Sequence, residues 1–155
     1  MTMTSAIHRP EWVPAAGHRL CLTGVHFDAV RIGGLHGELV ADHLIEATDE
    51  DAGPIVCEAG RGRWVYFLLP PGTARHHDWP PGVQRLPGQG GRTVAYVGVP
   101  ALEGSTWPLR WYSAPTPTAP HVDAGALHGA VARPRTGGPL TRRGALPAAD
   151  RSPGP

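Results

Sequence analysis

The sequence contains no lysine, so its 14 permanently basic side chains are all arginines. Arginine binds phosphate through two parallel hydrogen bonds, which would suit a nucleic-acid partner. We favour a compositional interpretation, because alanine, glycine, proline and arginine enriched together are typical of a GC-rich genome. The formal net charge of +1 is too small to indicate a general binder of polyanions.

Cysteine is also scarce, and long apolar runs are missing. Cys21 and Cys57 both lie in apolar, strand-like runs, where small buried thiols are common. Two isolated cysteines make neither a disulfide framework nor a zinc site. The start MTMTSAIHRPEW lacks the apolar region of a signal peptide, and no run approaches the roughly 18 apolar residues of a membrane span. We therefore expect a cytoplasmic protein with no membrane partner.

Glycine and proline are abundant, with 21 and 18 residues, and indicate many turns. We expect residues 1–9 to be a flexible leader, residues 10–132 to form a single domain, and residues 133–155 to be a disordered tail rich in Pro, Gly and Arg. The charge is uneven, because residues 1–60 hold three arginines against nine acids. Residues 61–155 hold eleven arginines against four acids.

Hydrophobic periodicity and turn residues divide the domain into short elements. Leu35, Leu39, Val40 and Leu44 recur at helical spacing and predict the strongest helix of the chain. Most other apolar runs are short, rich in β-branched and aromatic residues, and bounded by glycine or proline, which is typical of strands. The fold class predicted is α+β, a mainly antiparallel sheet packed by one or two helices. We expect a helical turn at 11–16, strands at 19–22, 25–32, 54–59, 63–69, 83–86, 93–99 and 109–112, and helices at 35–47 and 124–132. The first two strands are expected to be a strand pair or one bent strand.

His26 and Asp28 form the first candidate site. Residues two apart on a strand point the same way, so an imidazole and a carboxylate would face one divalent cation. A single pair leaves a metal underligated, and the plain alternative is a polar strand face. The run His76-His77-Asp78 is a second candidate, because adjacent polar residues on a loop can chelate a metal ion. The alternative is that these side chains are simply exposed to solvent.

The segment GRGRWVYFLLPPG is the third candidate. Arg61 and Arg63 flank Gly62 at the tip of an expected hairpin, and Trp64 opens the apolar strand that follows. Arg75, Arg85 and Arg92 lie on nearby loops. If they converge with the hairpin, the arginines make a face for phosphates on which Trp64 or Trp79 offers a stacking surface. The alternative is a core strand whose turn is kept soluble by two arginines.

Other catalytic motifs are absent. The sequence has no GxSxG elbow, and GRGRW lacks the lysine and the following helix of a Walker A loop. Cys57 lies inside an apolar strand, where burial makes a thiol unreactive.

The order of elements resembles the bifunctional DNA primase/polymerase N-terminal domain, of the archaeo-eukaryotic primase-like fold, whose actinobacterial members include short, divergent chains. The likeness covers roughly residues 19–131 and is best in GQGGRTVAYVGVPALEGSTWPLRWYSAP. The family carries two aspartates two apart on an early strand, a histidine on the strand after the glycine-rich hairpin and a later acid, and the resemblance implies that the carboxylates hold Mg or Mn. Here His26 and Asp28 supply one carboxylate, Trp64 or a neighbour stands where histidine is expected, and the run VQRLPGQ just before Gly90 contains no acid.

The resemblance therefore implies a degenerate DNA primase/polymerase-like domain without polymerase activity. Weak binding of single-stranded DNA or nucleotides would be retained through Arg61, Arg63, Arg85 and Arg92. One alternative is a residual metal-dependent nucleotidyltransferase that uses Asp28 and His26 as catalytic and metal-binding residues. Another is a regulatory module whose acidic helix, with Asp42, Glu46 and Asp49, meets a basic protein partner.

Overall fold

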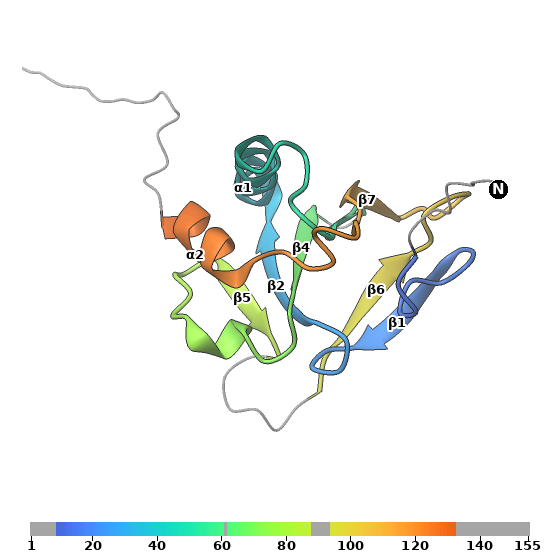
Figure 1. Cartoon of the computed structure of the whole chain (residues 1–155), viewed down its shortest axis with the longest axis horizontal. Coiled ribbons are helices and arrows are strands. Elements are labelled where there is room, and N and C mark those ends of the chain that lie inside the picture. The colour runs from blue at the N-terminus through green and yellow to red at the C-terminus, as the bar shows by residue number, and fades with distance from the viewer. Residues whose placement is uncertain (1–8, 61, 88–93, 133–155) are drawn as a thin grey trace, which may run out of the picture.

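The computed structural model describes residues 9–60, 62–87 and 94–132 of the 155-residue chain. Within these ranges lie two α-helices, seven β-strands and one short 3-10 helix (Figure 1), which confirms the α+β class. The elements are β1 (His18–Leu22), β2 (Asp28–Gly33), α1 (Gly34–Ala47), β3 (Ile55–Glu58), β4 (Trp64–Leu69), η1 (Ala74–His76), β5 (Val83–Leu86), β6 (Tyr96–Pro100), β7 (Leu109–Ser113) and α2 (Ala124–Ala132).

Five strands form an antiparallel sheet in the order β5-β2-β4-β3-β7. β3 and β4 form the expected hairpin. β2 then pairs with the other edge of β4, with Asp28 opposite Leu69 at one end and Gly33 opposite Trp64 at the other. β5 pairs only with β2 among the described residues, so it forms one edge of this sheet.

The two helices cover one face of the sheet. α1 packs over β2 and β4 and also contacts α2, and Figure 1 shows both helices on the same side of these strands. α1 lies close because Gly37 has no side chain: a Cβ there would be 2.5 Å from the carbonyl oxygen of Ile32 and 3.0 Å from a Val65 methyl carbon. Val40 and Leu44 are buried as expected, whereas Leu35 and Leu39 are exposed. The buried stripe is therefore rotated from the one that the leucine spacing predicts.

A second layer covers part of the opposite face. β1 and β6 pair into a two-stranded antiparallel ribbon, whose Cys21, Val97 and Val99 face the main sheet in a second apolar core. Phe27 is completely buried in this core, where its ring meets that of Trp12 edge to face at 5.2 Å between centroids. Burial of such a side chain stabilises the fold by about 1.5–3 kcal/mol. The molecule thus has three layers: helices, five-stranded sheet and ribbon.

Three local expectations were wrong. Residues 11–16 form turns instead of a helical turn. The strand expected at 25–32 begins only at Asp28, because Thr23 to His26 turn so that Phe27 enters the core. β1 and β2 are neither a strand pair nor one bent strand, since they belong to different sheets.

The expected leader and tail lie, except for Arg9, outside the described residues. No helix in the part of the chain that the structure describes is long and apolar enough to cross a membrane. Both cysteines are buried and free of disulfides, as their apolar surroundings predict.

Candidate functional site

His26 and Asp28 do not act as the expected pair. His26 lies in the turn before β2, with its Nδ1 atom 3.8 Å from the carboxylate of Glu11. Asp28 opens the strand, and its carboxylate accepts a hydrogen bond from the backbone N–H of Ala74 at 3.0 Å. The strand alternation that would point both side chains the same way does not extend back to His26.

The Mg or Mn site implied by the family resemblance does not fit these residues. Two-metal nucleotidyl transfer needs several carboxylates held around the ions. Among the described residues, no group of three or more His, Cys, Asp or Glu side chains is placed to hold a metal ion. Asp28 instead fixes a neighbouring backbone segment.

Arg63 and Trp64, the two candidate residues of the β3–β4 hairpin that the structure describes, make different contacts. Arg63 forms an ion pair with Glu38 of α1, and this carboxylate raises the pKa of the guanidinium above its ordinary value. Trp64 packs against Gly33, with the Arg31 guanidinium 4.2 Å from the centre of the indole. Both candidates are thus engaged within the protein, and Arg61 lies outside the described residues.

Asp28 and the hairpin lie at opposite ends of paired strands. Asp28 is opposite Leu69, and Trp64 is opposite Gly33, five positions further along β2. At the rise of a β-strand, this separation is about 17 Å. Arg85 is opposite Val30, three positions from Gly33 on β2, so the structure does not bring Arg85 beside Arg63 and Trp64. Arg92 lies outside the described residues.

Two arginines from different elements meet beside Asp28. Arg75 from η1 and Arg85 from β5 line the same cavity of about 280 Å³. The guanidinium of neither arginine forms an ion pair or hydrogen bond with another described residue. The Asp28 carboxylate in the cavity wall leaves a local formal charge of +1. This concave, positively charged surface is suited to an anion.

A turn-rich connection brings Arg75 to this place. Pro70, Pro71 and Gly72 end β4, and the Thr73 hydroxyl donates a hydrogen bond to the Pro70 carbonyl at 2.7 Å. Ala74 is buried and is tied to Asp28, so the next side chain, Arg75, projects from an anchored turn.

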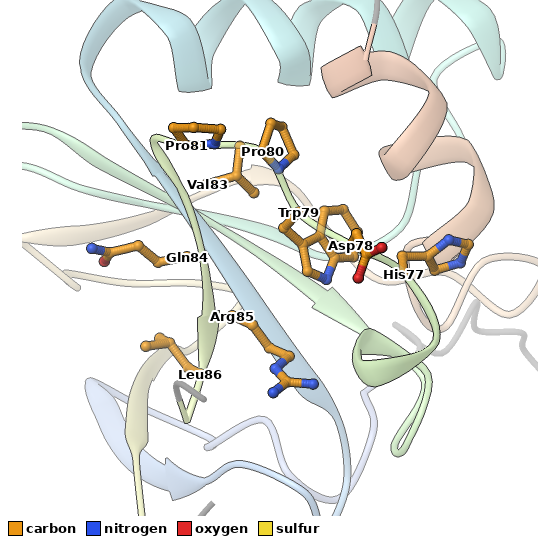
Figure 2. Close-up of a pocket in the computed structure, with 9 residues that line it drawn as sticks. All are labelled: His77, Asp78, Trp79, Pro80, Pro81, Val83, Gln84, Arg85 and Leu86. Atoms are coloured by element: carbon orange, nitrogen blue, oxygen red, sulfur yellow. The ribbon is translucent and has the colours of Figure 1, made fainter. Parts of the chain in front are cut away.

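A larger cavity of about 630 Å³ adjoins the first and shares Arg85 and Leu86 with it. It is lined by β5 and by the segment that precedes this strand; in Figure 2, Val83 and Arg85 lie on the Trp79 side of β5, and Gln84 and Leu86 project to the other side. The segment before β5 contributes aromatic, apolar and carboxylate groups, and β5 contributes apolar, amide and guanidinium groups. The lining residues are His77, Asp78, Trp79, Pro80, Pro81, Val83, Gln84, Arg85 and Leu86.

Ring contacts hold this segment against α2. His128 of α2 stacks on His77 at 4.7 Å between ring centroids and meets Trp79 edge to face at 5.5 Å. An imidazole nitrogen of His128 lies 3.0 Å from the Asp78 carbonyl oxygen, and the Trp79 indole N–H donates to the Ala74 carbonyl at 2.8 Å. The cavity wall is thus supported from two directions.

Of the expected binding residues that the structure describes, Arg85 is the one that lines a cavity and whose guanidinium has no partner among the described residues. Arg75 and Trp79 were predicted from the sequence only as members of a face shared with the hairpin residues, and Asp78 only as part of the His76-His77-Asp78 candidate. The pairing of Arg75 with Arg85 depends on the β2–β5 register and on the Asp28–Ala74 hydrogen bond. Neither has a local sequence signal, although a polar loop rich in histidine and tryptophan marks the segment.

No protein-family model, curated protein or solved structure matches the chain.

Proposed function

We propose that this domain binds a nucleotide or single-stranded nucleic acid by holding a phosphate group between Arg75 and Arg85. The observation that carries the proposal is that these two arginines, which have no acidic ion-pair partner among the described residues, line one cavity. A guanidinium presents parallel N–H donors that match two phosphate oxygens. Two such groups from different elements define one position for the anion.

The adjoining cavity supports a nucleotide over a simple phosphate ion. It shares Arg85 with the cationic cavity and has Trp79 and two prolines in its wall. Aromatic and apolar surfaces beside a cationic groove are the arrangement that accepts stacked bases in single-stranded nucleic acids. Its volume lies within the range usual for small-ligand sites.

The proposal includes descent from a primase/polymerase-like domain without polymerase chemistry. The antiparallel sheet, the two helices and the glycine-arginine hairpin are compatible with that ancestry. The Asp28 carboxylate accepts a hydrogen bond from the Ala74 backbone, and His26 lies in the turn before β2. A binding role therefore has more support than nucleotidyl transfer.

The acidic-helix alternative has less support. Asp42 accepts a hydrogen bond from the Tyr112 hydroxyl at 2.8 Å, and Glu38 is paired with Arg63. Part of the acidic surface of α1 is therefore used within the protein, so fewer of its carboxylates are available to a basic partner.

Fluorescence anisotropy with a labelled single-stranded oligonucleotide tests the proposal on the full chain. Replacing Arg75 or Arg85 by alanine is expected to weaken binding about tenfold or more, since charge-assisted hydrogen bonds contribute about 1.5–3 kcal/mol. The matched control is Arg63→Ala, which removes an arginine whose partner is Glu38 and is expected to leave Kd within twofold. Equal affinities for the parent chain, Arg75→Ala and Arg85→Ala would rule out this site.

A further inference from the structure

We infer that the larger cavity receives the base of the bound nucleotide and that Asp78 makes it selective for guanine. The inference rests on the proposed function and adds the class of base to it. It starts from the position of one carboxylate, because Asp78 is the acid in the wall of the larger cavity.

The two cavities suit the two parts of a nucleotide, its phosphate and its base. Arg75 lines only the smaller cavity, Trp79 and Asp78 line only the larger one, and Arg85 borders both. A phosphate held by the two arginines leaves the base and sugar to extend along β5 toward Trp79. The opposite orientation would place the phosphate near the Asp78 carboxylate, where two negative charges repel each other.

The hydrogen-bonding capacity of the Asp78 carboxylate also determines which base is preferred. Asp78 makes no side-chain hydrogen bond or ion pair with another described residue, so both of its oxygens are available as acceptors. Guanine presents N1–H and the N2 amino group side by side, which matches two carboxylate oxygens. Adenine and cytosine offer an amino group beside a ring-nitrogen acceptor. Uracil and thymine offer a single N–H between two carbonyl oxygens, which the carboxylate repels.

The wall that holds Asp78 is supported before any ligand arrives. The backbone carbonyl of Asp78 meets the His128 imidazole, and the next residue, Trp79, is fixed through its indole N–H to Ala74. Figure 2 shows Asp78 beside the Trp79 ring, between Trp79 and His77 on the segment that precedes β5. Because the backbone around Asp78 is fixed in this way, only the side chain of Asp78 loses freedom when it accepts a base.

Isothermal titration calorimetry of the full chain with GMP, AMP, CMP and UMP tests the inference. We expect GMP to bind at least about fivefold more tightly than UMP, since a bidentate contact to a base contributes about 1–3 kcal/mol of discrimination. Asp78→Asn, which keeps the size of the side chain, is expected to reduce that ratio to within twofold. Asp49→Asn, a change of the same kind at an exposed loop position, is expected to preserve it.

The outcomes separate the inference from the proposed function. If the four nucleotides bind with equal affinity and Arg85→Ala weakens all of them, the guanine inference is overturned and the phosphate site stands. If GMP is preferred but Asp78→Asn keeps the preference, the assignment to Asp78 is overturned. If the nucleotides bind with affinities that Arg75→Ala and Arg85→Ala do not change, both proposals fail.

Discussion

The Asp28 carboxylate accepts a hydrogen bond from the backbone N–H of Ala74, at 3.0 Å, and so joins the first residue of β2 to the first residue of η1. Ala74 is almost fully buried, so its N–H has little access to water if this partner is removed. The next residue is Arg75. Asp28 is therefore a positioning residue, which sets where one of the two phosphate-binding arginines projects.

Substitution of Asp28 tests this role. Asp28→Ala leaves the Ala74 N–H without its partner and is expected to lower the free energy of unfolding by about 1–3 kcal/mol. Asp28→Asn keeps an acceptor oxygen and is expected to cost less than about 1 kcal/mol. Urea unfolding followed by circular dichroism measures both values. Equal losses in the two variants would contradict the positioning role.

The same two variants separate positioning from metal chemistry. Asp28→Asn removes a negative charge beside Arg75 and Arg85, so oligonucleotide affinity is expected to rise up to about fivefold, as for exposed charge pairs. Asp28→Ala frees η1 and is expected to weaken binding. In primer extension with manganese, we expect the parent chain and Asp28→Ala to give the same background. Extension that disappears only in Asp28→Ala would favour the nucleotidyltransferase alternative.

The sequence was sufficient to locate most elements, because their signals are local. The helix expected at 35–47 is observed at Gly34–Ala47, and the strand expected at 63–69 at Trp64–Leu69. Gly33 and Gly34 mark the start of the helix, and Pro70 marks the end of the strand. The candidate site was less predictable, because Arg75 and Arg85 meet through strand register and one long-range hydrogen bond. Arg63 was predicted to bind phosphate, but it pairs with Glu38, which lies on a helix that packs over the sheet.

The salt dependence of oligonucleotide binding is expected to report the number of arginine–phosphate contacts. Each phosphate neutralised on a single strand contributes about −0.7 to the slope of log K against log salt concentration. Because Arg75 and Arg85 are proposed to hold one phosphate, Arg75→Ala and Arg85→Ala are each expected to make the slope less negative, by up to about 0.7. Anisotropy titrations between about 50 and 200 mM NaCl give this slope. With Arg63→Ala as the control, an unchanged slope in both cavity variants would argue against phosphate contacts there.

Two glycines in helices are expected to respond oppositely to alanine. At Gly37 a Cβ would lie 2.5 Å from the Ile32 carbonyl oxygen, so Gly37→Ala must push α1 away from the sheet. We expect it to destabilise the fold by about 1–3 kcal/mol, as in an overpacked core. At Gly129, an exposed position of α2, a Cβ has no neighbour within 4 Å. Gly129→Ala is expected to stabilise the fold by about 0.5–1 kcal/mol through helix propensity.

Thermal unfolding followed by circular dichroism distinguishes the two substitutions. A rise in Tm for Gly129→Ala and a fall for Gly37→Ala are expected. Similar shifts of the same sign would contradict the close approach of α1 to β2 and β4.

Tyr112 links the edge strand β7 to α1 and predicts a loss of stability in alkaline solution. Its hydroxyl donates a hydrogen bond to the Asp42 carboxylate, and this bond, with burial and the negative charge, raises the pKa of Tyr112 from 10.0 to about 12. Between these pH values the phenol is ionised in the unfolded chain but still protonated in the folded one. The folded chain then binds more protons, so the free energy of unfolding falls as pH rises from about 10 to 12.

Tyr112→Phe is expected to reduce this dependence, because it removes the group that titrates. Part of the dependence should remain, since burial raises the pKa of Tyr66, a contribution of the same sign. Urea unfolding at pH 9, 10, 11 and 12 on the parent chain and the variant measures the difference, and Tyr96→Phe, at an exposed position, is the matched control. If Tyr112→Phe and Tyr96→Phe lose stability with pH as steeply as the parent chain, the Tyr112–Asp42 hydrogen bond does not hold the two elements together in solution.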